Sequence, residues 1–259
     1  MRNPKTILIT GASSGLGAAL ARHYAAPGIT LVLTGRNPER LDAVARDCAA
    51  AGADVRSAAA DVTDRAFLAD WLPRMDAGAP IDLAIANAGI SAGTGGEGES
   101  PEQARRIFAT NLDGVLNTVH PLLPAMRARR RGQIALMSSL ASFRGFPGAP
   151  AYCASKAAVR VYGEALRGEL AREGIGVSVI CPGFVRTPMT DVNAFRMPFL
   201  MDAGRAAGII RRGLERNAAR IAFPWPTYLG AWMLGVLPAG LADRLLAAAP
   251  AKGGMRADA

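Results

Sequence analysis

The chain has 259 residues, half of them hydrophobic, which is enough to bury a large core within one domain. Its net charge of +9 suggests anionic ligands or surfaces, but the excess is scattered, which argues against a nucleic-acid-binding tail. Cys48, Cys153 and Cys181 have neither paired nor metal-ligand spacing, which excludes a disulfide framework and a zinc site and fits a reducing, cytoplasmic compartment.

Residues 5–10 have the pattern of a short buried parallel strand, an apolar run too short for a signal peptide. A glycine-rich loop and an alanine-rich helix follow, and the loop contains Gly11, Ser13, Ser14, Gly15, Leu16 and Gly17. Glycines at this spacing let the backbone turn tightly and approach a pyrophosphate, while the helix N-terminus supplies N–H groups and positive potential. The strand before and the helix after are what this mechanism requires, so the loop predicts a dinucleotide site rather than a simple turn.

Residues 29–34 form the second predicted strand, and Arg36 follows it, with Asn37 as helix N-cap and Pro38 as first helical residue. An NAD enzyme commonly carries an acidic residue here for the ribose hydroxyls, whereas a guanidinium suits a 2′-phosphate. Arg36 therefore predicts NADP(H) as the preferred cofactor. The alternatives are NAD(H) and a plain surface arginine, because no second basic residue stands in the glycine loop.

Residues 54–59 and 81–86 are the third and fourth predicted strands. Asp61 and Val62 follow the third, and Asn87, Ala88 and Gly89 follow the fourth. Alternating strands and helices of these lengths predict an α/β fold with one doubly wound parallel sheet, helices on both faces and a ligand crevice at the strands' carboxyl ends. Residues 89–98 are expected to form a mobile rim of this crevice.

A capping box with Pro101 at the first helical position starts a long helix that carries Asn111 in its interior. Asn is a poor choice there, so Asn111 is either merely exposed or held for a purpose. Pro121 and Pro124 should kink this helix further on. The basic cluster at residues 127–131 fits a solvated helix end better than a nucleic-acid patch. Residues 133–137 form the fifth strand, which brings Ser138 and Ser139 to the crevice.

Tyr152 and Lys156 lie four residues apart in a helix that Pro150 can start and Gly174 can end, so both side chains leave the same helix face. An ammonium near a phenol favours the phenolate, so the pKa of Tyr152, about 10 when unperturbed, is expected to fall toward the working pH. That would make Tyr152 a general acid and base. The chain has thirty basic residues and only three lysines, which indicates that a compact ammonium is needed here. The alternative is an ordinary pair on a helix face.

Residues 175–181 form the sixth strand, and Pro182, Gly183, Val185 and Thr187 follow at its end. An apolar lid over the crevice is expected from the side chains Phe143, Phe146, Phe184, Met189, Phe195, Met197, Phe199, Leu200 and Met201. These residues favour a bulky hydrophobic ketone or aldehyde, or the corresponding alcohol, over a sugar. The alternative is that they simply pack a helix at about residues 202–216.

Residues 221–242 carry no charge and include Trp225, Tyr228 and Trp232. Three prolines interrupt this run, which excludes a transmembrane helix. Either the run folds back over the crevice as core, or its aromatic residues contact lipid headgroups as a peripheral membrane surface. In the second case Arg211, Arg212, Arg216 and Arg220 would be drawn to anionic lipid. We expect residues 1–221 to form the dinucleotide-binding and catalytic domain, with residues 222–259 as an apolar extension packed on it.

With these motifs in place, residues 1–221 resemble the short-chain dehydrogenase/reductase family of NAD(P)-dependent oxidoreductases, which have a Rossmann fold. The matching segments are the glycine-rich turn, Asp61 and Val62 at the adenine, the Asn87–Gly89 segment, Pro182, Gly183 and Thr187 at the nicotinamide, and Ser139, Tyr152 and Lys156 as the active site. Several motifs in the right order and spacing are far more specific than any one alone.

The resemblance implies a role for each catalytic residue. Tyr152 would donate a proton to a carbonyl oxygen that Ser139 also hydrogen-bonds, while hydride passes from the nicotinamide to the carbonyl carbon. Lys156 would lower the tyrosine pKa and hold the nicotinamide ribose, and Asn111 would anchor a water that links Lys156 to solvent. Ser139 is chosen over Ser138 because the residues after it align with the family's usual continuation, although that pattern often has glycine where Ser142 stands. Cys153, beside the tyrosine, is expected to be a small packing residue.

The family is usually dimeric or tetrameric, which predicts a homodimer or homotetramer. The expected partner is a small, apolar substrate molecule. The alternative function is a non-catalytic or membrane-surface binding protein that keeps the fold, since fold alone does not give function. The intact tetrad favours the enzyme.

Overall fold

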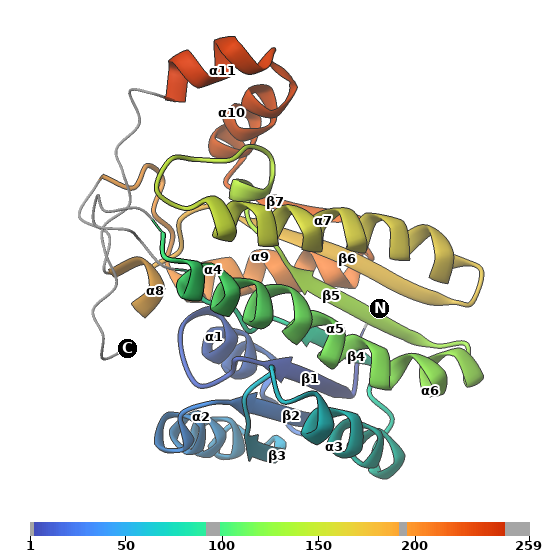
Figure 1. Cartoon of the computed structure of the whole chain (residues 1–259). Coiled ribbons are helices and arrows are strands. Elements are labelled where there is room, and N and C mark those ends of the chain that lie inside the picture. Colours follow the sequence, from blue (N-terminus) through green and yellow to red (C-terminus); the bar gives the residue numbers. More distant parts are fainter. Residues whose placement is uncertain (1–2, 92–98, 192–195, 247–259) are drawn as a thin grey trace.

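The computed structural model describes residues 3–91, 99–191 and 196–246. Across these residues the centre is a sheet of seven parallel strands in the order β3-β2-β1-β4-β5-β6-β7, which confirms the predicted doubly wound sheet (Figure 1). The strands are β1 (Thr6–Thr10), β2 (Thr30–Gly35), β3 (Asp54–Ala59), β4 (Leu83–Ala86), β5 (Gly132–Met137), β6 (Ile175–Pro182) and β7 (Arg220–Phe223). The winding reverses between β1 and β4, and the crevice outside that switch point is where a sheet of this kind binds its ligand.

The central strands β1, β4 and β5 are buried at every residue, as expected for parallel strands covered by helices on both faces. Six strands lie where the sequence predicts them. The seventh, β7, was missed because it has only four residues at the sheet's edge, where it pairs with β6. The predicted domain boundary at residue 221 falls inside β7, so the sheet itself continues past it, and the division stays a prediction.

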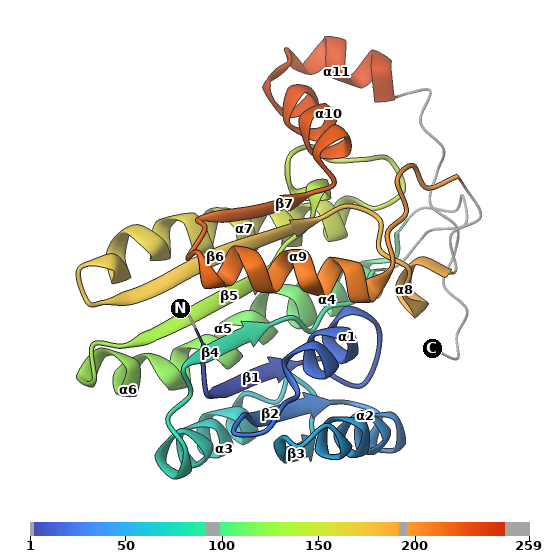
Figure 2. The ribbon, with the colours of Figure 1, turned by 180° about the vertical axis from the view of Figure 1, so that it is seen from behind.

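One face of the sheet is covered by α1 (Gly15–Tyr24), α2 (Pro38–Ala50) and α9 (Ala203–Glu215), which lie in front of the strands in Figure 2. Leu20, Leu41 and Ile210 from these three helices are buried in one core cluster with the strands. The Asn37 side chain accepts a hydrogen bond from the Arg40 N–H at 2.8 Å, which confirms the predicted N-cap of α2.

The opposite face is covered by α3 (Arg65–Gly78), α7 (Pro150–Ala171) and a helical stretch between them. That stretch consists of α4 (Pro101–Phe108), the π-helical turn η1 (Ala109–Asp113), α5 (Gly114–Val119), the 3₁₀ turn η2 (His120–Leu122) and α6 (Leu123–Ala128). The predicted capping box is present between Ser100 and Gln103. The predicted irregularity also occurs, since Pro121 lies in the 3₁₀ turn and Pro124 at the start of α6.

Three of the four arginines in the basic cluster at the end of α6 pair with acidic residues of the fold. Arg127 pairs with Glu169 and Glu173 on α7 and its C-terminal end. The Arg129 guanidinium makes two hydrogen bonds, of 2.7 and 2.9 Å, to the buried Asp76 carboxylate. Arg131 pairs with Asp82. These contacts favour a structural role for the cluster over binding to a nucleic acid.

The C-terminal segment after β7 forms α10 (Trp225–Val236) and α11 (Ala239–Leu246), which lie beyond the edge strand at one end of the molecule (Figures 1 and 2). Ala231 of α10 is buried with Leu140 of the 3₁₀ turn η3 (Leu140–Ser142) and with Cys181 of β6. Tyr228 meets the edge of the Phe143 ring at 5.5 Å between centroids. No helix in the described residues is both long enough and apolar enough to cross a membrane.

Candidate active site

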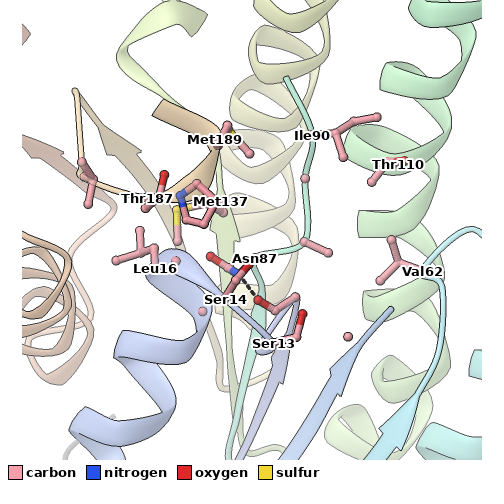
Figure 3. A pocket seen from close by; sticks show the side chains of 18 of the residues that line it. Ser13, Ser14, Leu16, Val62, Asn87, Ile90, Thr110, Met137, Thr187 and Met189 are labelled. Carbon is pink, nitrogen blue, oxygen red and sulfur yellow. Dashed lines mark hydrogen bonds between the residues drawn. The ribbon is translucent and has the colours of Figure 1, made fainter. Parts of the chain in front are cut away.

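A cavity of about 250 Å³, which we call the first cavity, lies at the carboxyl ends of the central strands. Ser13, Ser14 and Leu16 form one wall, and Val62 and Thr110 lie on the opposite side (Figure 3). Every residue predicted to bind cofactor lines this cavity: Gly11, Ser13, Ser14, Gly15, Leu16, Gly17, Arg36, Asp61, Val62, Asn87, Ala88, Gly89, Tyr152, Lys156, Pro182, Gly183, Val185 and Thr187.

Close packing explains why glycines occupy the loop between β1 and α1. Gly11 has a φ of +67°, and a Cβ there would lie 2.8 Å from the Cα of Ala88. A Cβ at Gly17 would lie 2.1 Å from the carbonyl oxygen of Gly11. Ser14 makes no side-chain cap hydrogen bond, so its side chain leaves the first N–H groups of α1 uncapped beside the cavity. This wall therefore offers hydrogen-bond donors and the positive end of a helix to an anion.

Asn87 holds the loops after β1 and β4 together. Its side-chain amide donates to the carbonyl oxygens of Thr10 at 2.9 Å and Gly11 at 3.3 Å. The Thr10 hydroxyl in turn accepts hydrogen bonds from the backbone N–H groups of Asn87 and Ala88. A Cβ at Gly89 would lie 3.1 Å from Nζ of Lys156 and 3.2 Å from Oδ1 of Asn111, closer than ordinary van der Waals contact.

Arg36 lines the first cavity beside Asp61, with 4.0 Å between its Nη1 and the Asp61 Oδ2. Both side chains are about half exposed, so this ion pair is weak and leaves the guanidinium available to a ligand. Arg40 also lines the cavity, one turn into α2. Arg40 was not predicted from the sequence, because a second cation was expected only in the glycine loop. Its signal was its place in the first turn of α2, directly after the loop that carries Arg36.

Three of the predicted catalytic side chains converge between β5 and α7. Lys156 lies one turn after Tyr152, with its Nζ 5.9 Å from the centre of the tyrosine ring. Ser139, just after β5, is hydrogen-bonded to the Tyr152 side chain. The Ser138 hydroxyl donates instead to the backbone carbonyl of Lys156 at 2.7 Å. Of the two serines, the structure therefore brings Ser139 to the tyrosine.

Burial dominates the pKa values of the tyrosine and the lysine. It raises the pKa of the Tyr152 phenol, whereas the hydrogen bond with Ser139 acts in the opposite direction. The predicted fall of the Tyr152 pKa was wrong for this structure, because burial raises that pKa. The lysine donates to the Met137 carbonyl oxygen at 2.9 Å, and burial lowers its own pKa to about 8. Tyr152 is therefore protonated at neutral pH, the form that can donate a proton.

Asn111 is fully buried in the π-helical turn η1, behind the cavity wall rather than in it. Its side chain accepts from the Ile90 N–H at 2.7 Å and donates to the Ile90 carbonyl oxygen at 2.9 Å and the Ser155 hydroxyl at 3.0 Å. Of the two alternatives, exposed or held, the structure shows the second. Asn111 ties the loop after β4 to the helix that carries Tyr152.

A second cavity, of about 490 Å³, opens on the other side of the same hydroxyl groups, and we call it the apolar cavity. Ser139 and Tyr152 line both cavities. The polar ones among the other lining residues are Thr190, Arg196 and Thr227. The rest are apolar or glycine: Leu140, Ala141, Phe146, Pro147, Ala149, Cys153, Gly183, Phe184, Met189, Pro198, Phe199, Pro226, Gly230, Ala231 and Leu234. A ligand that bridges the two cavities would meet both hydroxyls.

The chain is similar in sequence to a family of known proteins. The family model of the short chain dehydrogenases matches residues 5–195. An uncharacterized oxidoreductase of Myxococcus xanthus is 39% identical over 240 residues, which cover 92% of this chain and 95% of the relative. The chain belongs to the short-chain dehydrogenase family.

Solved structures agree over nearly the whole of this short-chain dehydrogenase. A short-chain dehydrogenase from Sphingobium yanoikuyae in complex with NADPH is 28% identical, with a TM-score of 0.79 and coverage of 98% of both chains. A short chain dehydrogenase/reductase from Burkholderia phymatum in complex with NAD is 26% identical, with a TM-score of 0.80 and coverage of 90% of this chain and 92% of that one. The Rossmann fold is thereby confirmed, and the chain is an oxidoreductase of this family.

Only part of the predicted apolar lid of this short-chain dehydrogenase lines the apolar cavity. Phe146, Phe184, Met189 and Phe199 lie in its wall. Met201 is buried in the core on the α9 side, and the Phe143 ring packs against the Arg160 and Arg220 guanidiniums. Phe195 and residues 92–98 of the predicted rim lie outside the described residues.

Another part of the wall comes from α10, for which the sequence left two alternatives. Pro226, Gly230 and Leu234 lie in the cavity wall, so α10 folds back over the crevice as in the first alternative, but it is not core, since Ala231 is its one buried residue. Its outer face remains exposed, with Trp225 at 65% and Val236 at 62%.

Proposed function

We propose that this short-chain dehydrogenase interconverts an apolar ketone or aldehyde and its alcohol, with NADP(H) as cofactor and Tyr152 as proton donor. The observation that carries the proposal is the position of Ser139 and Tyr152 in the shared wall of the two cavities. A carbonyl placed there would have its oxygen at the two hydroxyls and its carbon directed to the first cavity.

The residues around the first cavity fit a dinucleotide. The uncapped start of α1 and the glycines that bring it against β1 suit a pyrophosphate, and Asp61 and Val62 suit the adenosine half. Lys156 would hold the nicotinamide ribose, and the 182–187 segment would lie at the nicotinamide ring. When bound, this cofactor supplies or accepts the hydride.

The protein's own groups would handle the proton and the developing charge. Tyr152, protonated at neutral pH, would donate its Oη proton to the substrate oxygen as the carbonyl carbon becomes a carbinol carbon. The Ser139 hydroxyl would hydrogen-bond the same oxygen, which stabilises its negative charge in the transition state. The buried Lys156 ammonium would stabilise the tyrosinate left behind.

The preference for NADP(H) is supported by two cations, Arg36 and Arg40, in the wall of the first cavity. A 2′-phosphate beside them would make charge-assisted hydrogen bonds that a ribose hydroxyl cannot. The preference for an apolar substrate is supported by the composition of the apolar cavity, whose volume is in the range of small-molecule sites.

Replacing the proposed proton donor tests the reaction. Tyr152→Phe should lose about 10²–10⁴-fold in kcat for reduction of apolar ketones, because the phenyl ring keeps the packing but has no proton to donate. Tyr162→Phe is the matched control, since Tyr162 lies on the same helix with its hydroxyl hydrogen-bonded to His120. The measurement is NADPH consumption with a panel of long-chain, aromatic and polyol-derived carbonyls.

The alternative, a binding protein that keeps the fold without turnover, predicts no NADPH consumption with any carbonyl. Retention of most of the wild-type kcat by Tyr152→Phe would contradict the assignment of Tyr152. Faster turnover of the polyol-derived carbonyls than of the apolar ones would contradict the substrate class. The homodimer or homotetramer and the cytoplasmic location stay predictions.

A further inference from the structure

The outer faces of α10 and α11 expose most of the large apolar side chains that are exposed in the described residues. Of eleven such side chains, seven lie on these two helices: Trp225, Leu229, Trp232, Met233, Val236, Leu241 and Leu245. We call this set the α10–α11 face. It lies at the end of the molecule beyond β7, away from α1, α2 and α3 (Figures 1 and 2).

Helix α10 is apolar on its inner and outer sides alike. Its inner side lines the apolar cavity, and its outer side would be polar in an ordinary surface helix. No charged residue occurs between residues 221 and 242. An exposed apolar surface of this kind marks a binding surface for another apolar surface.

We propose that the α10–α11 face docks on the surface of an anionic lipid bilayer. The charges at its border support this partner. Arg244 follows Leu241 by one turn of α11, and Arg196 is exposed at the rim of the apolar cavity. The carboxylate of Asp243, on the same helix, is paired with Arg144. The border is therefore net positive, as is the whole chain at +9, and anionic headgroups complement it.

Two other occupants fit less well. The thirteen residues after α11, at positions 247–259, contain one large apolar side chain, Met255, and so cannot bury seven others. A second copy of this chain would cover the apolar side chains, but it would bring a second net positive border to the same interface, and like charges there are unfavourable. Trp225 and Trp232 also suit a headgroup layer, where indole rings find both apolar and polar surroundings.

Two of the four basic residues first suggested as lipid contacts have partners within the fold. Arg220 is bound to Glu164 and to the Tyr228 hydroxyl beneath α10. Arg211 pairs with Glu215 and packs on the Tyr24 ring of α1. The docking surface therefore consists of α10, α11 and their own border, and it does not depend on the proposed reaction.

Vesicle binding tests the proposal. The purified full chain is mixed with vesicles of phosphatidylcholine alone, or of equal amounts of phosphatidylcholine and phosphatidylserine, at low and high salt, and then sedimented. Binding is expected with the anionic vesicles and should weaken at high salt. The double variant Trp232→Ser, Met233→Ser should bind at least about tenfold more weakly, because it removes two exposed apolar side chains that do not line the apolar cavity.

Val161→Ser is the matched control, since Val161 is 55% exposed on α7, and it should bind like wild type. Tryptophan emission gives a second readout, because Trp71 is buried while Trp225 and Trp232 are exposed. Anionic vesicles should shift the emission to shorter wavelength. Absence of binding under every condition, or equal binding by wild type and double variant, would overturn the proposal. A smaller solution mass of the double variant without vesicle binding by wild type would assign the face to a second copy.

Discussion

Lys156 is a buried cation whose position works against stability at neutral pH. Its pKa is about 8 in the folded chain and 10.5 as the ordinary value. Between these values the unfolded chain binds more protons, so the free energy of unfolding should rise as pH increases from about 8 to 10.5. Below pH 8 the folded chain holds the ammonium in a desolvated place.

Lys156→Met should therefore stabilise the cofactor-free protein at pH 7, by about 1–3 kcal/mol, while removing activity. The gain should shrink as pH rises, because wild type loses the buried charge there. Urea unfolding at pH 7, 8, 9 and 10 measures this, with Lys5→Met as a control at an exposed lysine. A variant less stable than wild type at pH 7 would show that the hydrogen bond to Met137 outweighs desolvation.

Arg36 gives the cofactor preference a direct test. A charge-assisted contact is worth about 1.5–3 kcal/mol, so wild type should prefer NADPH over NADH by tenfold or more in kcat/KM. Arg36→Ala should remove most of that preference by weakening NADPH alone. Arg46→Ala, also on α2 but exposed and outside the first cavity, should leave the ratio unchanged. An equal ratio of kcat/KM for NADPH over NADH in wild type and Arg36→Ala would contradict the assignment of Arg36 to the 2′-phosphate.

For single residues, spacing in the sequence predicts which side chains meet but not how strongly they interact. Tyr152 and Lys156 are four residues apart on a helix, and residues after parallel strands share one edge, so their meeting follows from local geometry. The tyrosine pKa does not follow, because it depends on burial by segments far away in sequence. Arg36 was found from its place after a strand, whereas Arg40 needed the helix start to be considered as well.

Among the elements, α10 approaches the active-site loop closely at Gly235. A Cβ at this position would lie 2.6 Å from the carbonyl oxygen of Phe143, just after η3. In an open helix, Gly→Ala stabilises by about 0.5–1 kcal/mol, whereas forcing an extra carbon into tight packing costs about 1–3 kcal/mol. The collision should win, because backbone rather than a flexible side chain is in the way.

Gly235→Ala should therefore lower the free energy of unfolding by about 1–2 kcal/mol and raise KM for bulky substrates, since α10 forms a wall of the apolar cavity. Gly240→Ala on α11 is the control, because a Cβ there has nothing within 4 Å, and it should be neutral or stabilising. Thermal unfolding and substrate titration of both variants measure the effects. Equal stability of the two would mean that α10 moves freely away from η3.

The spacing of apolar residues and the capping residues and prolines at element ends predicted most helices and strands, because these signals act locally. The π-helical turn at Asn111 could not be derived in this way. The poor helix propensity of Asn marked the place, but the cause is tertiary, since the side chain bonds Ile90 and Ser155 on two other segments. Strand β7 also depends on tertiary pairing, because its four residues gain strand geometry from β6.

At the scale of the whole molecule, the sheet separates two core clusters, one under α1, α2 and α9 and one under α3, α5, α6 and α7. The first cavity lies where segments from both sides meet, and its walls combine α1, the loop after β4 and α7. Alternating strands and helices made this crevice predictable from the sequence. The apolar cavity was harder to predict from the sequence. Helix α10 forms part of its wall, and α10 follows β7, the strand that was not predicted.

Because the first cavity is built from segments of both halves, a ligand there should stabilise the whole chain. NADPH at 100 times its Kd should add about 2.7 kcal/mol to the free energy of unfolding, which for a chain of this size raises Tm by roughly 5–10 °C. NADH at the same concentration should raise it less. Tyr152→Phe should keep the full NADPH shift while losing turnover, because the change removes a hydroxyl and leaves the glycine loop and Arg36 intact. Arg36→Ala should reduce the NADPH shift to that of NADH. Thermal unfolding of the three proteins with each cofactor separates cofactor binding from catalysis. If neither cofactor raised the Tm of wild type, a dinucleotide site in the first cavity would be contradicted.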